Sequence, residues 1–175
     1  ESLAQAQDNK LRRVVELLGD VRDRSILEIG CGWGAQAREL ARAGARVKGI
    51  TLSPAQLHHA RDVIAASGLD DRVSLQLEDY RDQAGQYDAI VSIEMAEAVG
   101  EANLPTYFET IRRNLRLGGT AVLQVITIAE DRLDGYRRQP DFIQRHIFPG
   151  GFLPSKSLLT GLAQRAGLRT VHQES

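Results

Sequence analysis

The chain has 175 residues with a formal net charge of −1, and it is 42% hydrophobic and 26% charged. These values are typical of a single globular domain, and the near-neutral charge argues against nucleic acid as a partner. The apolar runs are too short to span a membrane, so we expect a cytoplasmic protein. The single cysteine, Cys31, excludes an internal disulfide bond and a multi-cysteine metal site, and we expect no metal.

The predicted elements alternate between helices and strands. Leucine and valine recur near the helical period in residues 1–19, which predicts a lead-in helix. Further helices are predicted over 35–43, 54–66, 105–115 and 155–166, and strands over 26–29, 46–51, 73–77, 87–93, 120–128 and 168–172. This alternation predicts an α/β fold with a doubly wound, mostly parallel sheet.

A glycine-rich turn joins the first predicted strand to the next helix. Gly30, Gly32 and Gly34 occupy alternate positions there, directly after a buried apolar run. Glycine accepts positive φ and has no Cβ atom to keep a ligand away from the backbone. A strand, a glycine turn and a helix N-terminus in this order predict a binding site for a nucleotide-like ligand.

Residues 129–154 interrupt the alternation. The segment combines scattered charge with an apolar run at 147–154, and it follows a predicted strand. Because α/β sheets bind ligands beyond the carboxyl ends of their strands, we expect this segment to form the wall of the acceptor site.

The two main candidate ligands for such a turn are a dinucleotide and S-adenosylmethionine, and the spacing of the glycines distinguishes between them. A dinucleotide site favours G-x-G-x-x-G with an acidic residue ending the second strand, whereas this chain has G-x-G-x-G and Thr51. The G-K-[ST] of a triphosphate-binding loop is also missing after the glycines. S-adenosylmethionine is therefore preferred over NAD or a nucleoside triphosphate.

Five segments in chain order then carry a specific resemblance. They read L-E-I-G-C-G-W-G at 27–34, G-I-T-L-S-P-A-Q at 49–56, E-D-Y-R-D at 78–82, S-I-E-M-A-E-A-V-G at 92–100 and I-F-P-G-G-F-L-P-S at 147–155. Together they resemble the cyclopropane fatty acid synthases, a family of class I S-adenosylmethionine-dependent methyltransferases that includes the mycolic acid cyclopropane synthases. The resemblance implies a Rossmann-like fold and methyl or methylene transfer to the double bond of an unsaturated acyl chain in a phospholipid.

The resemblance also implies which residues bind the cofactor. Thr51 and Gln56 match the positions that hold the ribose, and Leu77 and Glu78 match the pair at the adenine. The full set implied for S-adenosylmethionine is Glu28, Gly30, Cys31, Gly32, Trp33, Gly34, Thr51, Leu52, Gln56, Leu77, Glu78 and Asp79. A nucleophilic role for Cys31 is disfavoured because no histidine is placed near it.

Three positions match the catalytic site of the family. Glu97 matches the glutamate that holds a bound bicarbonate, which serves as the catalytic base, and Ile126 matches a position whose backbone faces that bicarbonate. Gln124 stands where the family has a histidine, and an amide forms hydrogen bonds but carries no charge. Ring closure is therefore less firmly implied than methyl transfer.

The resemblance extends beyond this chain. The family has an aromatic and cysteine-bearing segment before the equivalent of Glu1, and a tyrosine-bearing helix and a further strand after that of Ser175. We therefore expect the catalytic core of a longer enzyme that lacks the final strand of the sheet. A lipid acceptor implies transient contact with a membrane surface, at its inner face, and a homodimer stays open.

The acceptor is expected beside the apolar run at 147–154. At least one of Phe148 and Phe152 should line a tunnel for the acyl chain, with the arginines of 129–145 near its mouth to meet lipid phosphate. Two alternatives stay open: a methyltransferase acting on a small molecule such as an amine, and a binding module that retains the cofactor loop without catalysis.

Overall fold

The computed structural model describes residues 2–138 and 149–175. The chain divides into two compact units, and each is described by itself. Unit 1 comprises Glu1–Ile93 and Arg113–Leu123, and unit 2 comprises Glu94–Arg112 and Gln124–Ser175. Among the described residues, no helix combines the length and apolar character needed to cross a membrane.

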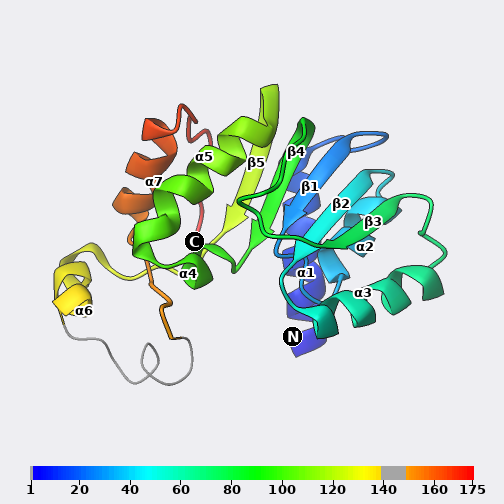
Figure 1. The fold of residues 1–175 in the computed structure, drawn as a ribbon, viewed down its shortest axis with the longest axis horizontal. Coiled ribbons are helices and arrows are strands. Elements are labelled where there is room, and N and C mark those ends of the chain that lie inside the picture. The colour runs from blue at the N-terminus through cyan, green and yellow to red at the C-terminus, as the bar shows by residue number, and fades with distance from the viewer. Residues whose placement is uncertain (1, 139–148) are drawn as a thin grey trace. The chain divides into compact units, whose positions relative to one another are not determined.

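Unit 1 contains the sheet, whose strand order is β3-β2-β1-β4-β5 (Figure 1). The pairs β1–β2, β1–β4 and β2–β3 are parallel. The strands are β1 (Ser25–Ile29), β2 (Arg46–Thr51), β3 (Val73–Leu77), β4 (Tyr87–Ile93) and β5 (Leu115–Gln124). Because the first four strands run in parallel, the carboxyl ends of β1, β2 and β3 lie along one edge of the sheet.

Three helices of unit 1 build one core with the sheet. They are α1 (Leu3–Leu18), α2 (Ala35–Arg42) and α3 (Pro54–Ala66). Val14 from α1, Leu40 from α2 and Ile64 from α3 join Ile26 and Val47 from the strands in a single buried cluster. Helix α3 begins where the sequence predicts, since Ser53 accepts a hydrogen bond from its first turn, and Ser2 caps the start of α1 in the same way.

The predicted class of fold is confirmed, but the fifth strand is displaced. The sequence predicts a strand over 120–128, whereas β5 covers Leu115–Gln124 and follows helix α5 (Leu104–Asn114) directly. Gly118 and Gly119 do not end the helix. A Cβ atom on Gly119 would lie 2.9 Å from the carbonyl oxygen of Asp88 in β4, so this glycine permits close approach inside the sheet. Ile128 lies beyond the strand, and its N–H donates to the carbonyl of Pro154.

The predicted sixth strand is wrong. Residues 168–172 form no strand, and residues 169–172 are exposed. The preceding helix α7 (Lys156–Arg165) ends with Gly167 at φ 81°, and the N–H of Leu168 donates to the carbonyl of Ala163. Leu168 therefore closes the helix instead of starting a strand.

The other elements belong to unit 2. They are α4 (Ala96–Val99), the 3₁₀ turn η1 (Glu101–Asn103), most of α5, the 3₁₀ turn η2 (Glu130–Arg132), α6 (Leu133–Arg138) and α7. The predicted insertion over 129–154 thus includes two short helical pieces, and its residues 139–148 lie outside the described part of the chain.

Candidate functional site

The glycine turn of unit 1 has the geometry of a ligand cradle. The N–H groups of Gly30 and Cys31 both donate to the carbonyl of Ile50, at 3.0 and 2.9 Å, and tie the turn to the end of β2. Gly32 has φ 51°, and a Cβ atom built on it would meet nothing within 4 Å. Gly34 has φ 86°, and its Cβ atom would lie 2.9 Å from that of Ala60. Gly32 therefore leaves space open, while Gly34 lets α3 approach.

Glu28, in β1, is buried next to the glycine turn and bonds the start of α2. Its side chain is only 2% exposed, and it accepts a hydrogen bond from the backbone N–H of Ala37 in the first turn of α2. The residue at the N-cap of that helix is Gly34, which has no side chain to accept this bond. Glu28 thus provides the missing cap from β1. Burial raises the pKa of Glu28 to about 8.

Cys31 is buried inside the turn. Burial raises the pKa of its thiol to about 12, and the nearby Glu28 adds to the shift. A thiol with so high a pKa is a poor nucleophile at neutral pH. The structure therefore agrees with a packing role for Cys31.

The structure brings the predicted ribose residues together. The hydroxyl of Thr51 donates to Gln56 Oε1 at 3.0 Å and accepts from the N–H of Ser53. The N–H of Glu78 donates to the carbonyl of Thr51 at 3.1 Å. Three residues from β2, α3 and the end of β3 thus meet at the same edge of the sheet.

Two acidic side chains at the end of β3 have cationic partners that the sequence does not reveal. Glu78 Oε2 lies 2.7 Å from Lys48 Nζ of β2, and both side chains are about one-fifth exposed (22% for Lys48 and 21% for Glu78). Asp79 receives the guanidinium of Arg81 through both carboxylate oxygens, and this bonding lowers the pKa of Asp79. Lys48 escapes sequence reasoning because a lysine inside a strand gives no signal of its partner.

Large apolar side chains at this edge remain open to solvent. Trp33, Leu52 and Leu77 are 56%, 64% and 54% exposed, and the ring of Trp33 meets that of His59 edge-on with centroids 5.3 Å apart. Exposed apolar groups beside an open glycine turn and polar side chains fit a ligand that has a flat ring, a ribose and a charged tail. The residues present therefore fit S-adenosylmethionine.

Unit 2 positions the predicted catalytic residues. Glu97 lies on α4, and its Oε1 accepts a hydrogen bond of 2.5 Å from the backbone N–H of Ile126. Gln124 Nε2 donates to Glu94 Oε1 at 3.2 Å, and the N–H of Glu94 donates to the carbonyl of Gln124. The segment around 94–97 and the segment 124–126 are thus held together at two points.

Two acceptor atoms in this part of unit 2 stay unsatisfied. Glu97 Oε2 and Gln124 Oε1 are buried and accept no hydrogen bond from the described residues. Buried acceptors without a donor are costly, and either atom can accept a hydrogen bond from an O–H group of a ligand or of water. The N–H of Ile126 already donates to Glu97.

The backbone before α4 is strained. Glu94 has φ 51°, a conformation that non-glycine residues rarely adopt, and the N-cap residue Met95 makes no side-chain capping bond. A helix of four residues has little stability of its own. Contacts from elsewhere in unit 2 therefore determine where Glu97 lies.

The described part of the predicted acceptor wall supplies such contacts. The N–H of Phe152 donates to the carbonyl of Glu97 at 2.8 Å. Gly100 has φ 76°, and its Cβ atom would lie 2.8 Å from the carbonyl oxygen of Gly150. Phe152 is buried beside Tyr136, with ring centroids 5.8 Å apart. Phe148 lies outside the described residues, so the acyl tunnel stays a prediction.

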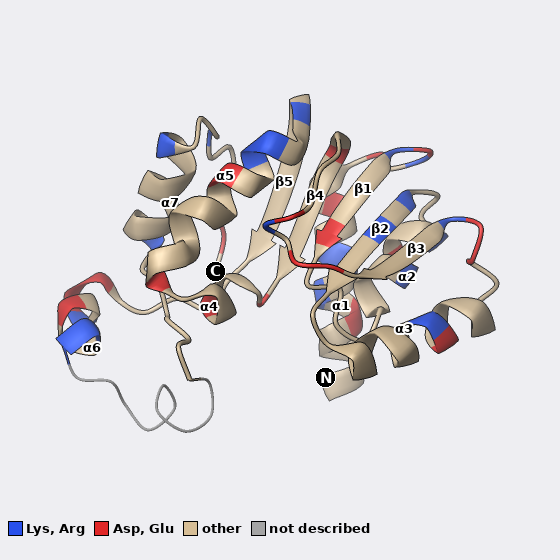
Figure 2. Cartoon of the chain, in the orientation of Figure 1, with Lys and Arg blue, Asp and Glu red and all other residues tan. Residues whose placement is uncertain are grey.

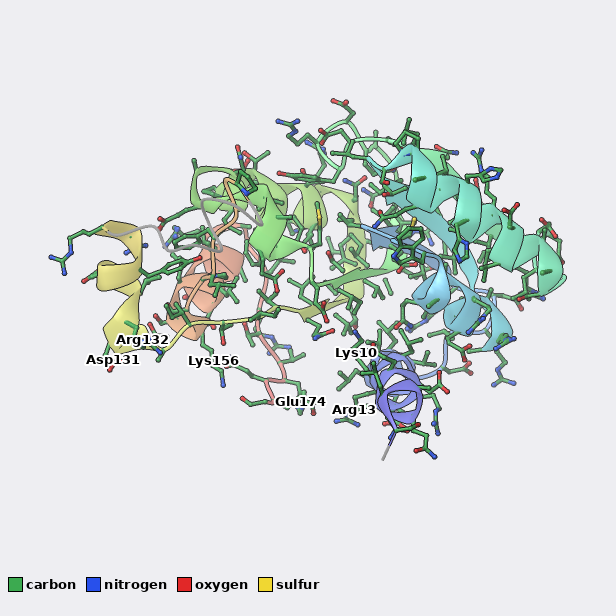
Figure 3. The ribbon with its side chains drawn as sticks, turned by 90° about the horizontal axis from the view of Figure 1, so that it is seen from below. Lys10, Arg13, Asp131, Arg132, Lys156 and Glu174 are labelled. Atoms are coloured by element: carbon green, nitrogen blue, oxygen red, sulfur yellow. The ribbon has the colours of Figure 1, made fainter. Side chains whose placement is uncertain are left out.

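The arginines of the insertion do not form a uniform cationic surface. Figure 2 shows acidic and basic residues side by side on η2 and α6. Arg137 is paired with Glu101 and Asp134, whereas Arg132 is exposed and Figure 3 shows it near Asp131. The proposed contact with lipid phosphate therefore does not extend to Arg137.

The parallel sheet and the glycine turn define the fold of the class I S-adenosylmethionine-dependent methyltransferases. A solved structure of a mycolic acid cyclopropane synthase complexed with SAH and CTAB superposes with a TM-score of 0.87 at 27% identity, covering 98% of this chain and 64% of that one. The family model described as mycolic acid cyclopropane synthetase matches residues 1–175. The chain belongs to this family.

The names of relatives within the family refer to different lipids. The chain is 41% identical to a tuberculostearic acid methyltransferase of Mycobacterium tuberculosis over 99% of its length and 41% of the relative. It is 38% identical to a cyclopropane-fatty-acyl-phospholipid synthase of Escherichia coli K12 over 89% of its length and 39% of the relative. A sphingolipid C9-methyltransferase of Komagataella phaffii is 34% identical over 86% of the chain and 33% of the relative. The chain thus spans about two fifths of the length of the first two relatives.

Proposed function

We propose that the chain is the catalytic core of an enzyme that transfers a methyl or methylene group from S-adenosylmethionine to the double bond of an unsaturated acyl chain in a lipid. The observation that carries the proposal is the open glycine turn beside the Thr51–Gln56 pair, in a chain matched along its whole length by the family model. S-adenosylmethionine supplies an electrophilic methyl group on a sulfonium.

The residues of unit 1 bind and orient the donor in this proposal. The turn at 30–34 lies against the methionine part, and the Thr51–Gln56 pair binds the ribose hydroxyls. Leu77 packs on the adenine, while Glu78 accepts a hydrogen bond from its amine. Glu28 and Cys31 stay buried and hold the turn in shape.

In this proposal the residues of unit 2 help to remove a proton from the cation that methyl transfer forms. An alkene that gains a methyl group becomes positively charged, and it must lose a proton to close a ring. Glu97 is fixed through one oxygen by the N–H of Ile126, and its other oxygen is free to hold the O–H of a proton acceptor. Gln124 offers a second acceptor atom. We propose bicarbonate for this acceptor.

A second outcome is methyl transfer in which the cation loses its proton without ring closure, which leaves a methylene group or a methyl-branched alkene. Both outcomes release one proton, and Gln124 cannot carry the positive charge that a histidine carries. The similarity to a tuberculostearic acid methyltransferase is consistent with this outcome.

The test substitutes Glu97 by glutamine in the full-length protein. Glu97→Gln keeps an oxygen for the N–H of Ile126 and removes the charge. We expect turnover on vesicles of an unsaturated phospholipid to fall by about a hundredfold or more, with cofactor affinity within about threefold of the parent. Loss of both together would mean that Glu97 is structural.

A further inference from the structure

We infer that Arg137 is a positioning residue for Glu97, and that α6 acts as a clamp on the segment 96–103. This inference rests on the proposed catalytic role of Glu97. It concerns a contact that neither the motifs nor the names of the relatives assign. Every residue involved belongs to unit 2.

The clamp starts from an ion pair. The guanidinium of Arg137 donates to both carboxylate oxygens of Glu101, with Nε 2.8 Å from Oε1 and 3.1 Å from Oε2, and Nη2 also contacts Oε1. A bidentate pair fixes both the distance and the orientation of its partners. Glu101 begins η1, directly after the short helix that carries Glu97. The pair therefore anchors the C-terminal end of the catalytic segment to α6.

The same arginine reaches the segment by a second route. Its guanidinium carbon lies 5.9 Å above the ring of Phe152, and Tyr136 contacts that ring from the same helix. The hydroxyl of Tyr136 accepts a hydrogen bond from the N–H of Leu153 at 3.3 Å. The N–H of Phe152 in turn donates to the carbonyl of Glu97. Arg137 and Tyr136 thus fix the residue that bonds the backbone of Glu97.

The catalytic segment needs such anchoring. Helix α4 has a single turn, an uncapped start and a left-handed residue before it, so its local sequence does not fix its position. Misplacement of a catalytic group by about 1 Å can lower turnover about a hundredfold. An anchor at each end of the turn, from Ile126 and Arg137, prevents this displacement.

The alternative role for Arg137 is a contact with a lipid headgroup. Its guanidinium already donates hydrogen bonds to two acidic residues, Glu101 and Asp134. The neighbouring Arg138 donates only to the backbone carbonyl of Asp134 in the described structure and is exposed. The two arginines are adjacent on one helix, so they form a matched pair for a test.

The experiment compares Arg137→Met, Glu101→Gln, the double variant and Arg138→Met in the full-length protein. Methionine keeps the contact with Phe152 and removes the charge. We expect each single variant of the ion pair to lower kcat about tenfold or more, with the affinity for S-adenosylmethionine and the KM for lipid within about twofold. The double variant should be no worse than either single variant, because both remove the same interaction. Arg138→Met should keep the parental kcat, while a raised KM for lipid in this variant would report the contact with lipid phosphate that is expected of the other arginines of 129–145.

Hydrogen exchange supplies a readout independent of turnover. Amides of the segment 96–103 should exchange about tenfold faster in Arg137→Met and Glu101→Gln, and at the parental rate in Arg138→Met. An unchanged exchange rate, or an unchanged kcat with a raised KM for lipid, overturns the inference. If the parent itself transfers no methyl group, the proposed function fails, and exchange alone still decides whether Arg137 anchors Glu97.

Discussion

Lys48 Nζ and Glu78 Oε2 lie 2.7 Å apart, and this ion pair joins the middle of β2 to the end of β3. It occupies one oxygen of the carboxylate that the family resemblance places at the adenine. The other oxygen is left to accept a hydrogen bond from a ligand. Lys48 thus sets the orientation of Glu78 before any cofactor binds.

Lys48→Met should therefore weaken the binding of S-adenosylmethionine. Without its partner, the carboxylate of Glu78 must be ordered when the ligand binds, and we expect a loss of about three- to tenfold in affinity. Arg46→Met removes an exposed cation from the same strand and should change affinity less than twofold. Titration calorimetry gives both numbers, and equal effects of the two variants would contradict a specific role for Lys48.

Gly32→Val tests the glycine cradle. A valine at φ 51° is strained, and its side chain occupies the space that is open in the structure. We expect cofactor binding to be lost while the circular dichroism spectrum stays that of a folded protein. Gly68→Val is the control, because Gly68 has φ 64°, is equally open and lies after α3, away from the turn. Normal cofactor binding by the Gly32 variant would contradict the proposal that the glycine turn binds S-adenosylmethionine.

Glu28 should make stability depend on pH. Burial raises its pKa in the folded chain to about 8, from an ordinary value of 4.5. Between these values the folded state keeps a proton that the unfolded state has released, so the free energy of unfolding falls as the pH rises. The slope from one group is at most about 1.4 kcal/mol per pH unit.

Glu28→Gln removes this titration and keeps an oxygen for the N–H of Ala37. The variant should gain stability relative to the parent as the pH rises from about 5 to about 8. Urea unfolding of both proteins across this range measures the difference. Parallel curves for the two proteins would show that Glu28 is already ionised in the folded chain.

Gly100→Ala probes the backbone around the catalytic segment. Its Cβ atom would lie 2.8 Å from the carbonyl oxygen of Gly150, and φ 76° disfavours alanine. The loop that bonds Glu97 must then shift, so we expect kcat to fall about tenfold with cofactor affinity unchanged. Gly135→Ala, in α6 with nothing within 4 Å of its Cβ position, should leave kcat unchanged. A Gly100 variant as active as the Gly135 variant would show that this contact is dispensable.

The sequence predicts the parts of the fold that local patterns encode. Apolar runs give β2 and β4 at their observed bounds, and the alternation of apolar and polar residues gives those of β3. Ser53 followed by proline gives the start of α3. The shift of β5 escapes prediction because Gly118 and Gly119 resemble a helix stop. Their actual role depends on the approach of β4, which is a contact between distant residues.

For the site as well, short-range motifs could be predicted from the sequence and contacts between distant residues could not. The glycine turn and Thr51–Gln56 are short-range motifs, and the structure places Thr51 and Gln56 within hydrogen-bond distance of each other, while their binding of the ribose stays a prediction. The partners that orient the acidic residues come from elsewhere in the chain. Lys48 lies 30 residues from Glu78, and Arg137 lies 36 residues from Glu101, so neither pair has a sequence signature.

The proposed reaction is tested most directly by mass spectrometry of lipids. The full-length protein is incubated with vesicles of an unsaturated phospholipid and S-adenosylmethionine that carries an isotopically labelled methyl group. We expect the acyl chain to gain one labelled carbon at its double bond, as a cyclopropane ring, a methylene group or a methyl-branched alkene, because each of these forms from the cation by loss of one proton. Glu97→Gln should lower this gain about a hundredfold or more. Cofactor binding by the protein without any labelled acyl chain, or label found only on an amine, would contradict the proposed reaction.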